Sequence, residues 1–181
     1  MARVSLVDES GHPELAELIA TIKSGRRGTL LNIYKLLLQS PPLAASWLDH
    51  MSAVRWQTTL AGRIREIVVI RIARLHRCAY VLQQHVPELA VAEGLTLAEC
   101  DALADWRASG LFSERERAVL AYADAMVAGA EVTDDVFEPL RKHLDERQLV
   151  ELTVLIGSYI MHNRVFNALK VDLEPKLNAG G

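Results

Sequence analysis

The 181-residue sequence has few cysteines and no large excess of either charge, which excludes several classes of protein. Its two cysteines, Cys78 and Cys100, are too few for a disulfide scaffold and suit a reducing compartment. Its 20 basic and 23 acidic residues give a net charge of -3, which provides no basic excess for binding nucleic acid. Apolar runs such as 67–70 are far shorter than the roughly 20 residues of a bilayer span. The first residues also lack the apolar segment of a signal peptide. We therefore expect a cytoplasmic protein with neither nucleic acid nor membrane as a partner.

Signals for β-strands are nearly absent, whereas signals for helices recur along the whole chain. Apolar residues at spacings of three and four, capping residues and flanking Gly or Pro predict helices over 13–24, 28–39, 40–51, 62–75, 77–93, from 96 onward, 113–129, 133–144 and 145–165. The stretch 67–72 is β-branched, but no second strand is available to pair with it, so we expect a buried central helix. Pro87 should kink or break the helix over 77–93. The sequence predicts one all-α domain over 1–181, a bundle of eight or nine helices.

The segment from Glu66 to His85 contains the most informative combination of side chains. Cys78 and His85 are seven residues apart, so on one helix they would share a face about 10.5 Å apart along the axis. A thiol peroxidase needs a thiolate, a group that lowers its pKa and a second thiol that resolves the sulfenic acid. The position for that second thiol is Val81, and Cys100 is on a different predicted helix. Cys78 could alternatively be a small buried hydrophobe and His85 a packed core histidine.

Other candidate sites are weaker. His162 is surrounded by buried-type residues on the last helix and could face the same cavity as His85. No two histidines are three or four residues apart, and there is no Cys/His cluster, so we expect no metal site. The sequence also lacks a Gly-rich phosphate loop and a Gly-x-Ser-x-Gly motif, and we expect no cofactor.

The segment resembles the signature of the carboxymuconolactone decarboxylase and AhpD-like superfamily. The AhpD branch has a glutamate, a Cys-x-x-Cys that begins twelve residues later, and a histidine four after the second cysteine. Glu66, Cys78 and His85 match this spacing, Tyr80 is the inner residue before the second cysteine, and Val81 replaces that cysteine. The preceding run over 63–71 and the Gly-Leu-Thr turn over 94–96 are also similar to the family. The recognisable part covers roughly residues 50–130.

The resemblance implies an all-α, AhpD-like fold that assembles as a trimer or hexamer, with the active site near a subunit contact. In the AhpD branch the peroxide-reactive cysteine is at the position of Val81, whereas the decarboxylase branch uses a histidine and polar groups instead of cysteines. His85 could then act as general acid or base with Glu66 as its partner. The candidate catalytic residues are His85, Glu66 and Cys78. The candidate substrate-binding residues are Tyr80, Arg71, Arg74 and His162, with Arg71 or Arg74 as the group that holds a substrate carboxylate.

Three functions follow from these observations. The leading hypothesis is a decarboxylase-like enzyme performing proton transfer (decarboxylation, isomerisation or hydration) on a small anionic carbonyl or lactone compound. The alternative is a one-cysteine thiol peroxidase that uses Cys78 and an external thiol. The third is a non-catalytic, oligomeric helical protein.

Overall fold

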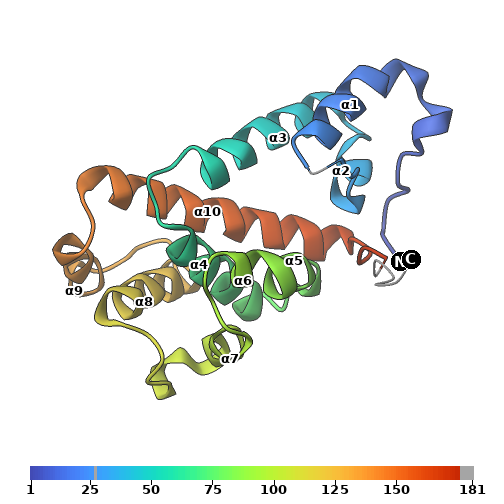
Figure 1. The fold of residues 1–181 in the computed structure, drawn as a ribbon. Coiled ribbons are helices and arrows are strands. Elements are labelled where there is room, and N and C mark those ends of the chain that lie inside the picture. Colours follow the sequence, from blue (N-terminus) through green and yellow to red (C-terminus); the bar gives the residue numbers. More distant parts are fainter. Residues whose placement is uncertain (27, 176–181) are drawn as a thin grey trace.

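The computed structural model describes residues 1–26 and 28–175, and the regular structure within those ranges is helical (Figure 1). Its α-helices are α1 (Ala16–Ser24), α2 (Asn32–Leu37), α3 (Pro41–Trp56), α4 (Gly62–Leu75), α5 (Ala79–Gln84), α6 (Ala90–Ala92), α7 (Leu97–Ala102), α8 (Glu114–Ala128), α9 (Asp134–Phe137) and α10 (Glu146–Leu169). Short 3-10 turns cover Glu9–Gly11, Pro13–Leu15, Leu103–Ala108 and Glu138–Lys142. The predicted all-α fold is confirmed. If the continuous run from α5 to α6 counts as one helix, the described residues form nine α-helices.

Helix α4 lies at the centre of the molecule, as its composition predicted. Every residue from Ile64 to Ala73 is buried, because α8, α10 and α5 pack around the helix. Its β-branched residues therefore contact neighbours on all faces, which explains why the run lacks the polar stripe of a surface helix. This burial removes the glutamate at position 66 from solvent, with an exposed fraction of 0%.

The chain between α5 and α6 passes through a π-helical turn, His85–Leu89, that contains Pro87. Proline has no backbone N–H and cannot continue an ordinary helical hydrogen-bond ladder. The wider turn accommodates this defect without ending the helical run. Pro87, where the sequence predicted a kink or break, thus lies in a π-helical turn that begins at His85, and the helical run continues through it.

The remaining helices form layers on the two sides of α10 (Figure 1). Helix α3 packs on one side of α10, and α4 and α8 pack on the other. Helices α1 and α2 contact α3, and the two ends of the described chain meet, with the Met1 amino group 3.1 Å from the Asp172 carboxylate. Among the described residues, no helix combines the length and apolar character needed to cross a membrane.

Candidate functional site

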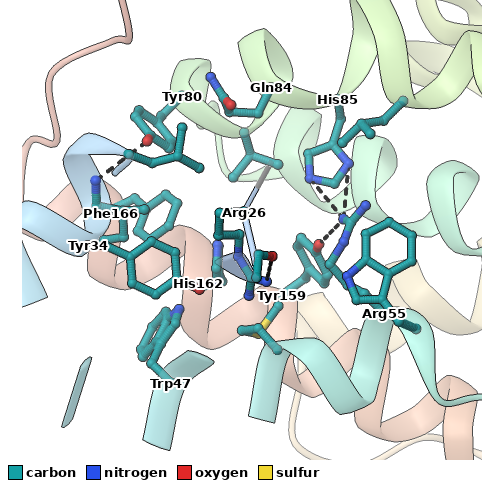
Figure 2. A pocket seen from close by; sticks show the side chains of 17 residues that line it. Arg26, Tyr34, Trp47, Arg55, Tyr80, Gln84, His85, Tyr159, His162 and Phe166 are labelled. Atoms are coloured by element: carbon teal, nitrogen blue, oxygen red, sulfur yellow. Dashed lines mark hydrogen bonds between the residues drawn. The ribbon is translucent and has the colours of Figure 1, made fainter. Parts of the chain in front are cut away.

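A cavity of about 300 Å³ lies between α3, α5 and α10, and residues of the α1–α2 connection also line it (Figure 2). Its walls are mostly aromatic and aliphatic. Each element contributes several side chains to the lining: Arg26 and Tyr34 near the α1–α2 connection, Trp47, Met51, Arg55 and Trp56 from α3, Tyr80, Val81, Gln84 and His85 around α5, and Tyr159, His162 and Phe166 from α10.

His85 is hydrogen-bonded to Glu66 beside this cavity. The Nδ1 atom of His85 is 2.6 Å from Oε2 of Glu66, and both residues are buried. Glu66 reaches this position from the first half of α4, whereas His85 begins the π-helical turn. The structure thus brings together two of the three predicted catalytic residues, 19 positions apart in sequence.

Arg55 joins this pair to a tyrosine. Its Nη1 donates to the Tyr159 hydroxyl at 2.6 Å and lies 3.2 Å from His85 Nε2 (Figure 2). Its Nη2 donates to Glu66 Oε1 at 3.3 Å. Arg65 approaches the same Glu66 oxygen at 3.7 Å and also pairs with Glu93 at 2.6 Å. The Glu66 carboxylate therefore has cations on two sides. We refer to Arg55, Glu66, His85 and Tyr159 as the polar cluster.

The contacts of the polar cluster favour a neutral His85. Arg55 Nη1 lies 3.2 Å from His85 Nε2 and 3.5 Å from Nδ1. A guanidinium can only donate, so the shorter contact fits an imidazole whose Nε2 accepts from Arg55 and whose Nδ1–H donates to Glu66. In this pattern the imidazole is neutral. Burial lowers the pKa of His85 below its ordinary value, and Arg55 lowers it further, against the opposing effect of Glu66. Burial alone would raise the pKa of Glu66, but His85, Arg55 and Arg65 outweigh burial and hold that carboxyl ionised.

Tyr159 keeps its proton in this environment. Burial raises the pKa of Tyr159 above its ordinary value of 10, although Arg55 opposes the shift. Its oxygen accepts from Arg55, so its own O–H remains a potential donor toward the cavity.

Tyr80 and His162, two of the predicted substrate-binding residues, line the cavity. The Tyr80 hydroxyl donates to Glu174 in the C-terminal segment, and it accepts a weak hydrogen bond from the Ile33 backbone at 3.5 Å. Removal from bulk water lowers the pKa of His162 well below its ordinary value. The His162 ring packs 4.1 Å from Phe166 and 5.3 Å from Tyr159, measured between centroids.

The structure does not bring the other two predicted substrate-binding residues, Arg71 and Arg74, to the cavity. Arg71 makes a two-pronged ion pair with Asp124 and donates to the Leu103 and Ala104 carbonyls. Arg74 pairs with Asp101. Both arginines pair outside the polar cluster, and they tie α4 to α7, α8 and the turn between them. The cavity's own arginines, Arg26 and Arg55, come from other elements.

Cys78, the third predicted catalytic residue, is seven residues before His85 in the sequence, but it does not line the cavity. It is the N-cap residue of α5 with an extended backbone (φ -87°, ψ 90°), so it lies at the edge of the helix that carries Val81 and His85. Val81, at the position of the missing second cysteine, does line the cavity. Cys78 is 1% exposed, and burial raises the pKa of its thiol, which opposes thiolate formation. Cys100 is also buried, in a separate apolar cluster with Ile67 and Ile70.

Reasoning from the sequence missed Arg55, Tyr159 and Arg26. One signal could have found Tyr159: residues 159, 162 and 166 are aromatic side chains at spacings of three and four, which places them on one face of the final helix. Arg55 has no such local signal, because its partners come from α4, α5 and α10. Within residues 1–26 and 28–175, His, Cys, Asp and Glu side chains form no group of three that could hold a metal ion.

Comparison with known proteins places these features in a family context. The profile of the carboxymuconolactone decarboxylase family matches residues 41–125, which include α3, α4, α5 and most of α8. The Escherichia coli K12 protein YnjA is 33% identical over 130 residues, covering 71% of this chain and 68% of its own.

Two solved structures share the fold. A protein of unknown function from Agrobacterium tumefaciens, whose name relates it to the antioxidant defence protein AhpD, is 26% identical with a TM-score of 0.72, covering 78% of this chain and 97% of its own. A peroxidase-related protein from Silicibacter sp. TM1040 has a TM-score of 0.82 at 18% identity. The match covers 98% of this chain and 94% of the Silicibacter chain.

Proposed function

This chain belongs to the carboxymuconolactone decarboxylase family, and from that premise we propose that it is an enzyme that moves protons on a small anionic carbonyl or lactone compound. The reaction class is decarboxylation, isomerisation or hydration. The observation that carries the proposal is the buried Glu66–His85 pair at the wall of a largely apolar cavity. A neutral imidazole oriented by a carboxylate is a competent general base near neutral pH.

Arg55 gives this pair a means of responding to an anionic substrate. In the free protein the lone pair of His85 Nε2 is occupied by Arg55 Nη1. A substrate carboxylate is a stronger acceptor than a neutral imidazole, so it would draw the guanidinium into a charge-assisted contact. That shift frees Nε2 to accept a proton from the carbon next to the substrate carbonyl. The imidazolium formed is stabilised by Glu66, 2.6 Å from Nδ1.

The remaining steps use the same groups. In an isomerisation, the electron pair of the broken C–H bond delocalises onto the carbonyl oxygen, and the imidazolium returns the proton at another carbon. In a decarboxylation, His85 first takes a proton from solvent. The C–C bond then breaks, carbon dioxide leaves with the carboxylate oxygens, and the electron pair forms an enolate whose carbon takes that proton from His85. In both cases Arg55 and the Tyr159 O–H can stabilise the developing negative charge.

Turnover of a substrate panel tests this proposal. Unsaturated lactone carboxylates and β-keto acids would be incubated with the protein in D₂O, and exchange, isomerisation and loss of carbon dioxide followed by NMR. We expect His85→Gln to lower the rate by about 10² to 10⁴, and Glu66→Gln to lower it as well. His12→Gln is the matched control, because His12 also pairs with a carboxylate (Glu14, 2.8 Å) but lies at the surface. Equal rates in His85→Gln and wild type would reject the proposal.

The one-cysteine peroxidase is the second candidate, supported by the AhpD-related name of the Agrobacterium structure. The burial of Cys78 and the raised pKa of its thiol argue against it. We expect neither cysteine to react quickly with a thiol reagent in the native protein and both to react in denaturant. Rapid native labelling, together with hydroperoxide reduction that Cys78→Ser abolishes, would favour the redox function.

A further inference from the structure

Arg26 adds a second cationic side chain to the cavity. Together with Arg55 it accounts for the charged residues that line the cavity, and no carboxylate lines it within the described part of the chain. Arg55 is buried at 8% exposure, whereas Arg26 is half-buried beside the α1–α2 connection. The cavity therefore presents positive charge from two separate elements, which favours an anionic ligand.

The Arg26 guanidinium is held in place by neutral groups. Its Nη1 donates to the Gly25 carbonyl at 2.7 Å and to the Ser52 hydroxyl at 3.3 Å, and its Cζ lies 5.3 Å from the centre of the Tyr34 ring. Burial raises the pKa of Tyr34, with Arg26 opposing the shift. These contacts orient the guanidinium without neutralising its charge, and they leave that charge available to a ligand.

Part of the cavity wall is aromatic and suits a flat ring. Trp47 and Phe166 are stacked with 6.4 Å between centroids and 21° between planes, and Tyr80 meets Phe166 edge-on at 5.1 Å. Figure 2 shows Tyr34 and Phe166 on one side of the cavity and Arg55 on the other. A cavity of about 150 Å³ is enough for benzene, so about 300 Å³ has room for one substituted ring.

We infer that Arg26 determines ligand specificity, and that the ligand is a single-ring aromatic acid with two acidic groups. One acidic group would bind Arg55 and the other Arg26. The inference rests on the proposed function, since it concerns the same cavity. Arg26 lies outside residues 41–125, so the second contact comes from a segment that the family profile does not match.

Binding of three probes tests this inference: terephthalate (flat, two carboxylates), benzoate (flat, one carboxylate) and trans-cyclohexane-1,4-dicarboxylate (two carboxylates, not flat). Trp47 and Trp56 line the cavity, so quenching of tryptophan fluorescence reports occupancy. At equal ionic strength we expect terephthalate to bind about two- to fivefold more tightly than benzoate, the usual effect of one added, partly screened ion pair. The cyclohexane compound should bind more weakly than terephthalate.

Variants identify the source of the preference. Arg26→Gln should bind terephthalate and benzoate equally, and Arg26→Lys should keep most of the difference because it retains the charge. Arg141→Gln, which removes a surface arginine paired with Glu138, is the matched control and should behave as wild type. Thermal unfolding verifies that each variant is folded. A wild-type protein without the terephthalate preference, or a preference that survives Arg26→Gln, would overturn the inference.

The same measurements separate this inference from the proposed function. His85→Gln should lose turnover but keep the Arg26-dependent binding preference. Turnover that depends on His85 and is accompanied by no Arg26-dependent preference would leave the proposed function standing and reject the role of Arg26. An Arg26-dependent preference for terephthalate without His85-dependent turnover would support the role of Arg26 and reject the proposed function.

Discussion

Arg55 is the residue on which the other members of the polar cluster depend. It supplies one of the two cations beside Glu66, occupies the lone pair of His85 and donates to Tyr159. A buried carboxylate is stable as an anion only when such partners are present. The charge on Glu66 and the neutrality of His85 are therefore linked through one guanidinium.

Replacing Arg55 by Gln should change both stability and titration. Breaking a buried ion pair commonly costs about 3 kcal/mol, and the contact from Arg65 at 3.7 Å replaces only part of the lost interaction. Because Arg55 lowers the pKa of His85, its removal should move the His85 pKa upward. Urea unfolding and NMR titration of the imidazole measure the two effects. Arg141→Gln is the control, and an unchanged His85 titration in Arg55→Gln would contradict the linkage.

At the scale of the helices, the sequence predicted boundaries well where capping was local. The capping boxes at Thr96–Glu99 and Ser113–Glu116 are both present, since each needs only residues three apart. The helix predicted over 28–39 is shorter, over Asn32–Leu37, because Gly28 has a positive φ of 79° and Leu31 is extended. Apolar spacing alone does not report such backbone turns.

Two residues with positive φ, each following a helix, allow a matched test of how a β-carbon in left-handed backbone changes stability. Lys170 ends α10 at φ 50° and ψ 54°, where a β-carbon is unfavourable. Lys170→Gly should therefore stabilise the protein by up to about 1 kcal/mol. Gly94, at φ 83°, has no atom within 4 Å of a built β-carbon, so Gly94→Ala should cost a similar amount through backbone strain alone. Chemical denaturation measures both, and changes of the same sign would contradict the argument.

At the scale of the whole molecule, the site depends on segments that are distant in sequence. The spacing of Glu66 and His85 predicted a pair, and the structure joins them because α4 and α5 pack together. The same packing directs Arg71 to Asp124 instead of the cavity. Arg55 and Arg26 reach the cavity only through the placement of α3 and of the α1–α2 connection, which no short-range pattern encodes.

The assembly state is a prediction at this scale. The family resemblance predicts a trimer or hexamer, and α10 presents exposed apolar side chains at Val150, Val154 and Met161, with exposed fractions of 64%, 45% and 41%. Large exposed apolar residues on one element commonly mark contact surfaces. Light scattering should give a mass three or six times 20.1 kDa, and Val154→Glu should reduce it. A monomer at micromolar concentration would contradict the prediction.

The stability of the folded chain should decrease as the pH falls from 7 to 5. The pKa of His85 and that of His162 are both lowered in the native state, because burial disfavours the charged imidazole. In the unfolded chain these side chains bind protons near their ordinary pKa of 6.5, so below that pH the unfolded state holds more protons than the native state. The free energy of unfolding then falls by about 1.4 kcal/mol per pH unit for each such histidine. The pKa of Glu66 is lowered from 4.5, so its loss of charge contributes only at lower pH.

Urea unfolding from pH 7 to 5 should show this slope, and His162→Phe should make it shallower. His12→Gln, at a side chain that is 46% exposed, is the control. Its free energy of unfolding should fall with pH more steeply than that of His162→Phe, by about 1.4 kcal/mol per pH unit, which corresponds to one proton. Equal slopes in wild type and His162→Phe would mean that His162 carries a proton in the native cavity.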